Sequence, residues 1–188
     1  ARPSEPMAAA DRAARTAQAD RLCARAYAEA GGADGDDHGG GVALGAVGGY
    51  GRGDLAPHSD LDVVLVSDTG HDPGAVATRV WYSLWDSGLR IDHSVRSTAQ
   101  MLAAAEDDLK VALGLLDVRH LAGDPNLTLR LRTTVLAQWR RQARERLPDL
   151  RTLVDARHHL VGELAHASVP DLKEAEGGLR DATVLKAL

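Results

Sequence analysis

The sequence predicts an α+β fold, in which a mixed β-sheet is flanked by helices and followed by a helical segment. Short apolar runs near residues 42–47, 61–66 and 89–95 have the length and the neighbouring turn residues of buried strands. After the second and third runs, residues near 73–86 and 98–117 have the longer apolar-polar pattern of helices. Strands that alternate with helices in this way form a sheet whose faces the helices cover.

The segment before the first strand has a different composition. Residues 4–30 are rich in alanine, with arginine and aspartate interspersed, which is typical of a helix. Residues 31–41 combine glycine with aspartate and predict a flexible connection. The acidic cluster at residues 36–38, which includes one histidine, is a weak candidate for a metal site. We therefore expect residues 1–41 to form an N-terminal helix and a linker.

Residues 42–122 are the expected core, and residues 123–188 the start of a helical domain, because no strand is evident after Pro125. Arginines crowd this second part, and a solvated helix face explains them. The alternative is a docking surface for an acidic loop of a protein substrate. His158 and His159 are adjacent, so they point to different sides of a helix and make a poor metal pair. The arginines are Arg130, Arg132, Arg140, Arg141, Arg144, Arg146, Arg151 and Arg157.

Composition limits the partners that the chain can have. A formal net charge of −5 and an aromatic content of 3% argue against nucleic acid, which favours basic surfaces and stacking platforms. The single cysteine, Cys23, allows no internal disulfide, and no apolar run approaches the length of a membrane span. The N-terminus lacks the pattern of a signal peptide. We expect a cytoplasmic protein with no membrane partner.

The most informative segment joins a glycine-rich turn to two carboxylates. Gly48 and Gly49 follow the first apolar run, and Asp60 and Asp62 stand where the second begins. Glycines let the backbone approach a ligand closely, and the N–H groups of a short helix that opens at Gly49 can point at phosphate oxygens. Residues two apart in a strand share a face, so the two aspartates present their carboxylates together.

This pairing predicts a site for a metal-bound nucleotide. Two carboxylates at close range repel each other unless a cation lies between them, and oxygen ligands beside phosphates favour Mg²⁺. Either half of the motif alone is common in turns and loops. Both halves together, twelve residues apart from Gly48 to Asp60, indicate that Asp60 and Asp62 bind metal while Gly48 and Gly49 bind the phosphates.

Two other phosphate-binding motifs fit less well. Residues 51–56 match the G-x-G-x-x-A fingerprint of dinucleotide-binding folds, but that fingerprint opens a crossover helix. Pro57 and the next strand come too soon for such a helix. A P-loop is excluded because no Gly-Lys-Ser/Thr follows the glycines.

Arg52 and Ser59 are further candidates for nucleotide binding. Arg52 could neutralise phosphate charge, although a solvated arginine explains it equally well. Ser59, just before the acidic strand, could donate to a phosphate or cap the local turn. The sequence leaves both alternatives open.

Residues 46–55 (AVGGYGRGDL) and 59–62 (SDLD) resemble the polymerase-β-like nucleotidyltransferase superfamily, and within it the bacterial PII uridylyltransferase/uridylyl-removing enzymes. Residues 84–89 (LWDSGL), which run into 93–97 (HSVRS), resemble the segment that follows in those enzymes.

A further match lies far downstream. Residues 170–173 (PDLK) and 177–181 (GGLRD) resemble the second signature of the same enzymes, so the resemblance extends from about residue 42 to the C-terminus. The clustering of a lysine, two glycines and an Arg-Asp pair in otherwise helical sequence suggests a loop folded back on the active site, in which Lys173 and Arg180 bind the nucleotide. The alternative is a turn between two helices with Asp181 as its cap.

The resemblance implies a polymerase-β-like sheet and a reaction. UMP or AMP would pass from UTP or ATP to a tyrosine hydroxyl of the nitrogen regulatory protein PII, and pyrophosphate would leave. Asp60 and Asp62 would hold Mg²⁺. Superfamily members add a third carboxylate from a neighbouring strand, which assigns Asp92 to catalysis and metal binding here. His93, beside Asp92, is the alternative as a base or metal ligand.

Two other functions stay open. Asp92 matches the glutamine synthetase adenylyltransferases, whereas residues 93–96 match the PII-modifying enzymes. A regulatory module could instead hold nucleotide without transferring it, although intact Asp60 and Asp62 argue against this.

The composition, rich in Ala, Arg and Gly and without Phe, indicates a high-GC genome compatible with an actinobacterium. The resemblance implies that such enzymes transfer adenylyl groups, so the preference for UTP or ATP stays open.

The chain also resembles a fragment. Its relatives continue into an HD phosphohydrolase-type domain that removes the nucleotide and two ACT domains that sense glutamine. We expect this chain to lack both activities.

Overall fold

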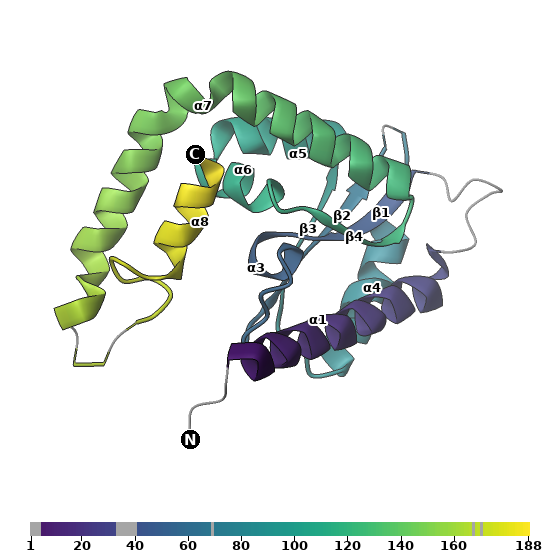
Figure 1. Cartoon of the computed structure of the whole chain (residues 1–188). Coiled ribbons are helices and arrows are strands. Elements are labelled where there is room, and N and C mark those ends of the chain that lie inside the picture. Colours follow the sequence, from purple (N-terminus) through teal and green to yellow (C-terminus); the bar gives the residue numbers. More distant parts are fainter. Residues whose placement is uncertain (1–4, 33–40, 69, 167, 170) are drawn as a thin grey trace. The chain divides into compact units, whose positions relative to one another are not determined.

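A computed structural model of the chain describes residues 5–32, 41–68, 70–166, 168–169 and 171–188 (Figure 1). The acidic cluster at 36–38 lies outside the described residues. The chain divides into two compact units, residues 1–135 and residues 136–188, which are described separately below.

Unit 1 is built around a four-stranded sheet. Its strands are β1 (Val42–Ala46), β2 (Leu61–Ser67), β3 (Ile91–Ser97) and β4 (Arg119–Gly123), in the order β3-β2-β1-β4. Strands β2 and β3 are parallel, whereas β1 is antiparallel to both β2 and β4. The predicted mixed sheet is therefore confirmed, together with the three strands expected from apolar runs.

Strand β4 is the one that the sequence did not predict. Every residue of β4 is only partly buried, and two of its five residues, Arg119 and His120, are polar. Both side chains have polar partners. Arg119 pairs with Asp20, which is distant in sequence, and His120 Nδ1 lies 3.0 Å from Thr128 Oγ1 on the next helix. A strand stabilised in this way has no apolar run by which it could be recognised.

Helices surround the sheet at the positions expected from the sequence. Ser97 begins α5 with a capping box, in which its side chain accepts from the Gln100 N–H and the Gln100 side chain accepts from the Ser97 N–H. The helices of unit 1 are α1 (Glu5–Tyr27), which continues into η1 (Ala28–Gly32), α3 (Gly48–Gly51), α4 (Gly74–Asp86), α5 (Thr98–Asp107), α6 (Leu109–Leu115) and the first part of α7 (Pro125–Val161).

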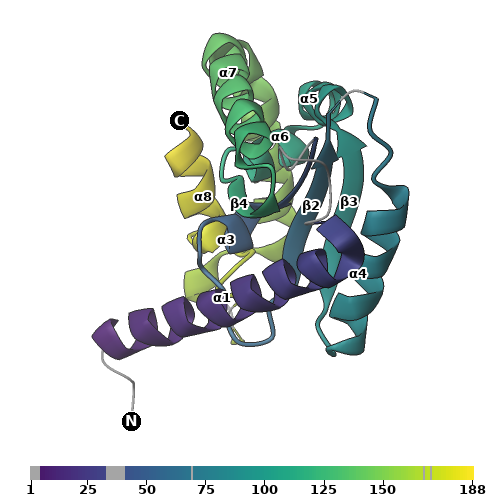
Figure 2. The same cartoon turned by 90° about the vertical axis from the view of Figure 1, so that its right-hand side faces the viewer.

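Different helices cover the two faces of the sheet. Leu61, Val63 and Leu65 of β2 are buried in one core with side chains of α1 and α4, and Figure 2 shows these two helices beside each other. Because side chains alternate along a strand, Asp62 and Val64 point to the opposite face, where α5 contacts β2 and β3. Both faces of β2 are largely buried, and Asp62 is its one acidic residue, among apolar side chains and the terminal Ser67.

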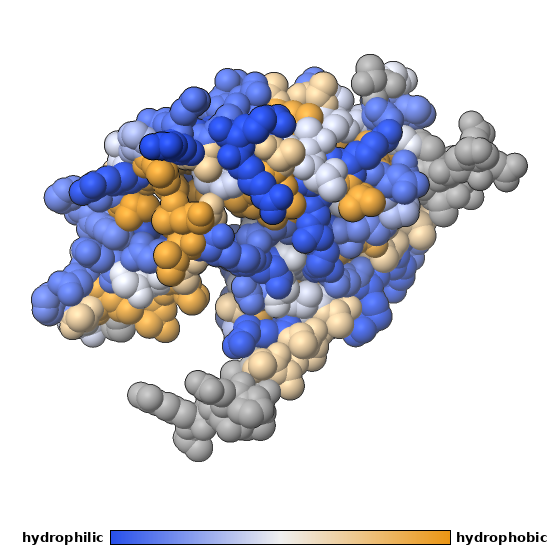
Figure 3. All heavy atoms as spheres, turned by 45° about the horizontal axis from the view of Figure 1, so that its top comes forward, coloured by the Kyte–Doolittle hydropathy of each residue, from blue (hydrophilic) through white to orange (hydrophobic). Residues whose placement is uncertain are grey.

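Unit 2 contains the rest of α7, the short η2 (Leu164–His166) and α8 (Leu179–Ala187). The Trp139 indole N–H donates to the Ala187 carbonyl at 2.8 Å and so ties α8 to α7. Hydrophilic side chains follow α7 in Figure 3, and Arg140, Arg141, Arg144 and Arg151 are exposed, as a solvated face predicts.

Arg157 differs from those arginines. Its side chain is only 16% exposed, and it donates to the Glu174 carbonyl at 2.9 Å and to the Asp181 carboxylate. Its inclusion in the solvated face was therefore wrong, because the loop before α8 covers it.

Among the residues that the structure describes, no helix has both the length and the apolar character needed to cross a bilayer.

Candidate nucleotide site

The glycine turn forms the short helix α3 directly after β1. Val47 is extended, and Gly48 then adopts a φ of +56°, a left-handed conformation that glycine accepts at low cost. The first backbone hydrogen bond of the turn runs from the Gly51 N–H to the Val47 carbonyl at 2.9 Å. The N–H groups of residues 48–50 therefore precede the helical hydrogen bonds, as in any helix N-terminus. The helix begins one residue before the predicted Gly49.

Gly48 lies directly against the Asp62 carboxylate. A Cβ atom added at Gly48 would be 3.1 Å from Asp62 Oδ2, so the absence of a side chain leaves space beside that oxygen. The Val47 N–H also donates to the Asp62 carbonyl at 3.0 Å, which fixes the end of β1 to the start of β2. The two halves of the motif are thus adjacent in space.

Asp60 immediately precedes β2, and its side chain is exposed. Asp60 Oδ1 accepts from Arg90 Nε at 3.0 Å, and the Arg90 guanidinium also donates to the His58 carbonyl. A metal ion at Asp60 would share the carboxylate with this guanidinium or replace it.

Asp92 is placed beside Asp62. The two residues are opposite each other in the parallel register of β2 and β3, so their side chains share a face. His93 points to the other face, where its ring centroid lies 4.8 Å from that of Trp81 and 5.4 Å from that of Trp85 on α4. The structure therefore places Asp92, rather than His93, on the same face of the sheet as Asp62.

No three His, Cys, Asp or Glu side chains of the described residues are close enough to hold a metal ion by themselves. This arrangement still fits Mg²⁺, which proteins commonly bind through one or two carboxylates together with substrate phosphates and water. The space that Gly48 leaves beside Asp62 Oδ2 is where such a shared ion would fit.

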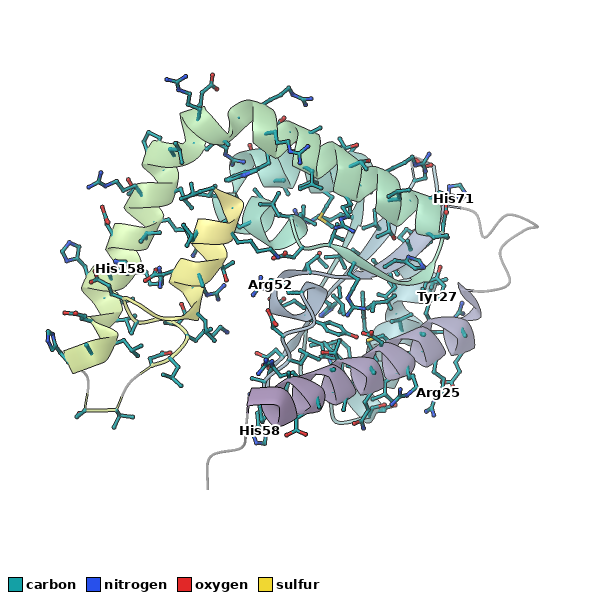
Figure 4. The ribbon with its side chains drawn as sticks, in the orientation of Figure 1. Arg25, Tyr27, Arg52, His58, His71 and His158 are labelled. Carbon is teal, nitrogen blue, oxygen red and sulfur yellow. The ribbon has the colours of Figure 1, made fainter. Side chains whose placement is uncertain are left out.

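Arg52 follows α3 and is held by two carboxylates. Its Nη1 donates to Asp117 Oδ2 at 2.7 Å and its Nε to Asp54 Oδ2 at 3.1 Å. Figure 4 labels Arg52 beside the glycine turn. Burial would lower the pKa of Arg52, but the hydrogen bonds and charges of Asp117 and Asp54 outweigh it and raise that pKa. Arg52 thus braces the turn, with Nη2 3.8 Å from where a Gly49 Cβ would lie.

Ser59 lies in the loop before β2 and is exposed. Its N–H donates to the Ala56 carbonyl at 3.2 Å, which closes a local turn. The residue also lines an open pocket of about 300 Å³ between α1, this loop and the turn before β3, together with Arg15, His58 and Arg90.

Lys173 and Arg180 belong to unit 2. The Lys173 N–H donates to Asp171 Oδ1 at 2.9 Å, and Arg180 Nε donates to Glu174 Oε1 at 3.1 Å. These contacts organise the loop before α8, and a role for the two side chains in nucleotide binding stays a prediction.

Asp181 stabilises the same loop. Its Oδ2 accepts from the Gly177 N–H at 2.7 Å, and its Oδ1 accepts from Arg157 and lies 3.0 Å from His158 Nε2. Partial burial would raise the pKa of Asp181, but the hydrogen bonds from Arg157, His158 and Gly177 outweigh it and lower that pKa to about 2. Asp181 lies in the first turn of α8, whose N-cap is Gly178, so it stabilises the turn through the Gly177 N–H and is not the cap itself.

Residues beneath the glycine turn were missed by the sequence analysis. They are Asp20 on α1, Tyr50 on α3 itself, Asp117 in the turn after α6 and Arg119 at the start of β4. They form no recognisable sequence motif, because residues in contact here are up to 99 positions apart in the sequence.

The comparison with protein families agrees with this geometry. Residues 36–111 match the family described as "Nucleotidyltransferase domain". The chain carries a nucleotidyltransferase domain. The domain match covers α3, Asp60, Asp62 and Asp92, so a nucleotide is the substrate class that the family implies.

The chain is also similar to curated bifunctional uridylyltransferase/uridylyl-removing enzymes. The enzyme of Streptomyces coelicolor is 58% identical over 151 residues, which are 79% of this chain and 18% of that protein. Those of Mycobacterium tuberculosis and Corynebacterium glutamicum are 45% and 36% identical, and the matches cover 19% and 21% of their lengths. The chain thus spans about a fifth of the length of these relatives.

Proposed function

We propose that this chain transfers a nucleoside monophosphate, UMP or AMP, to a tyrosine hydroxyl of the nitrogen regulatory protein PII in the cytoplasm. Similarity to enzymes named uridylyltransferases supports UTP as the donor. The observation that carries the proposal is the closeness of Gly48 to the Asp62 carboxylate, because it brings the turn proposed to bind the phosphates next to the carboxylate proposed to bind the metal ion.

Each part of the site has a defined task in this reaction. The N–H groups of residues 48–50 would bind the phosphates at the start of α3. Asp60 and Asp62 would hold Mg²⁺ shared with those phosphates. When bound, Mg²⁺ would neutralise phosphate charge and stabilise the attacking and leaving oxygens.

The transfer itself exchanges one bond for another. The bond between the tyrosine oxygen and the α-phosphorus would form as the bond from that phosphorus to the bridging oxygen breaks, and pyrophosphate would leave. The tyrosine proton would pass to a carboxylate on the same face, for which Asp92 is the candidate. Most of the catalysis would come from positioning and charge stabilisation.

The direct test is incubation of the chain with PII, Mg²⁺ and either UTP or ATP labelled at the α-phosphate. We expect label on PII, with UTP preferred, and no label with the Asp62→Asn variant. Absence of label on PII with both nucleotides would refute the proposed function.

A second candidate is transfer of AMP to glutamine synthetase. The position of Asp92 opposite Asp62 favours it, because the adenylyltransferases of that class carry this third carboxylate. Glutamine synthetase as a second acceptor in the same assay separates the two proposals. Nucleotide binding without label on either protein would instead indicate a regulatory module.

A further inference from the structure

The turn between α6 and β4 packs directly under the glycine turn. A Cβ atom added at Gly51 would lie 2.2 Å from the Asp117 carbonyl oxygen, so only glycine permits this approach of the two backbones. Two residues later, Arg119 Nε donates to the Gly51 carbonyl and Arg119 Nη2 to the Tyr50 carbonyl, each at 3.2 Å. One side chain of β4 therefore binds the last two carbonyl groups of α3.

Helix α1 completes this arrangement through Asp20. Arg119 forms a bidentate pair with Asp20, with Nη1 to Oδ2 at 2.9 Å and Nη2 to Oδ1 at 3.0 Å. The Tyr50 hydroxyl, which is buried, donates to the same Oδ1 at 2.8 Å. The Arg119 guanidinium also lies 5.4 Å from the centre of the Tyr50 ring, within the range of a cation–π contact.

These contacts determine the orientation of α3, which is too short to be held in place by its own hydrogen bonds. Helix α3 has four residues, so its own hydrogen bonds are few. Arg119 fixes its carbonyl end and Asp20 fixes its only large side chain, Tyr50. Because the helix is rigid over one turn, fixing the carbonyl end also sets the direction of the N–H groups at the other end. Figure 1 shows α3 close to β4 and α1.

We propose that Arg119 and Asp20 form a clamp that positions the glycine turn for the nucleotide triphosphate. Neither residue needs to touch the substrate, so both are positioning residues rather than catalytic ones. The inference rests on the proposed function, in which residues 48–50 bind the phosphates. It predicts that loss of the clamp weakens binding in proportion to the number of phosphates on the ligand.

The test compares the affinity of the chain for Mg²⁺–UTP and for UMP by isothermal titration calorimetry. Arg119→Gln removes the charge and most of the donors, and Arg119→Lys keeps the charge but cannot form the bidentate pair. We expect Arg119→Gln to weaken UTP binding about tenfold and UMP binding less than about threefold, with Arg119→Lys between Arg119→Gln and the unchanged protein. Tyr50→Phe removes only the hydroxyl and should weaken UTP binding about threefold.

Arg79→Gln is the matched control. Arg79 Nε donates to the Ala30 carbonyl at 2.8 Å and so ties α4 to η1 in the same unit, with no contact to α3 described. This variant should lower the melting temperature and leave the UTP affinity unchanged. The melting temperature of every variant, followed by circular dichroism, shows whether it is folded.

The outcomes separate the clamp from the proposed function. A folded Arg119→Gln variant that binds UTP within twofold of the unchanged protein, or that loses UTP and UMP equally, would overturn the clamp. If Arg119→Gln does not fold, an unchanged UTP affinity in Tyr50→Phe would overturn it. An unchanged protein that binds neither UTP nor ATP would instead remove the proposed function, and the clamp with it.

Discussion

At the scale of single residues, the proposed chemistry depends on Asp62. It is the acidic side chain inside β2, and it lies against Gly48 and opposite Asp92. We expect Asp62→Asn to lower the rate of nucleotide transfer about 100-fold or more, because the amide lacks the charge that would hold the metal ion in the proposed reaction. Asp86→Asn, at the exposed end of α4, should change the rate little.

The measurement is steady-state transfer to PII with labelled UTP, together with a circular dichroism spectrum of each variant. An Asp62→Asn variant that is folded and transfers at the normal rate would exclude this carboxylate from the reaction.

Substitution of Gly51 tests the close packing between the glycine turn and the Asp117 backbone. The Cβ of Gly51→Ala would meet the Asp117 carbonyl oxygen at 2.2 Å, so backbone must move. We expect a loss of about 1–3 kcal/mol in the free energy of unfolding, measured with urea, and weaker nucleotide binding.

Gly114→Ala in α6 is the control for this prediction, since a Cβ there would meet nothing within 4 Å. It should stabilise the chain by about 0.5–1 kcal/mol because alanine favours a helix. Equal effects of the two substitutions would show that the contact with Asp117 is not a constraint.

At the scale of elements, the sequence predicted what local patterns encode. The apolar runs predicted β1 and β2, and the helical period predicted α4. The motif also predicted that the glycine turn lies next to the acidic strand. Strand β4 was not, because Arg119 is stabilised by Asp20, 99 residues away in sequence. The groups beneath α3 depend on that pairing, so only the structure could reveal them.

The packing of helix α1 also could not be predicted from the sequence. Its alanine-rich composition predicted a helix, but composition does not say what the helix packs against. Cys23, Ala26 and Tyr27 are buried in the core with the sheet and α4. The Tyr27 hydroxyl donates to the Val42 carbonyl at 3.1 Å, which ties the end of α1 to the start of β1.

The loop before α8 should respond to acid through Asp181. The pKa of Asp181 is about 2 in the folded chain, against an ordinary value of 3.8. A carboxylate with a lowered pKa stabilises the folded state fully above its unfolded pKa, and this stabilisation is lost as the pH falls from about 4 towards 2.

We expect Asp181→Asn to cost about 1 kcal/mol in urea unfolding at pH 6, and the difference from the unchanged protein to shrink below about pH 4 and to vanish once the pH is well below about 2. Asp155→Asn is the control, because Asp155 is 58% exposed and its pair with Arg151 is 3.7 Å long, so it should have little effect at either pH. A pH-independent difference for Asp181→Asn would contradict the role of its charge.

At the scale of the whole molecule, charge is unevenly divided. Residues 1–135 contain 13 Lys and Arg against 19 Asp and Glu, a formal charge of −6, whereas residues 136–188 contain 9 against 8, a formal charge of +1. The nucleotidyltransferase domain therefore lies in the acidic unit. An acidic surface repels a nucleoside triphosphate, which carries several negative charges itself.

Nucleotide binding should therefore depend on a divalent cation. With Mg²⁺ removed by EDTA, we expect the affinity for UTP to fall about 100-fold or more, because Asp60 and Asp62 then repel the phosphates that they would otherwise share a metal ion with. Spermidine at matched ionic strength should not restore binding, since it supplies positive charge without a coordination site. Titration calorimetry of UTP in Mg²⁺, EDTA and spermidine measures this directly. Undiminished affinity in EDTA would mean that the N–H groups of the turn and nearby arginines suffice to bind the phosphates.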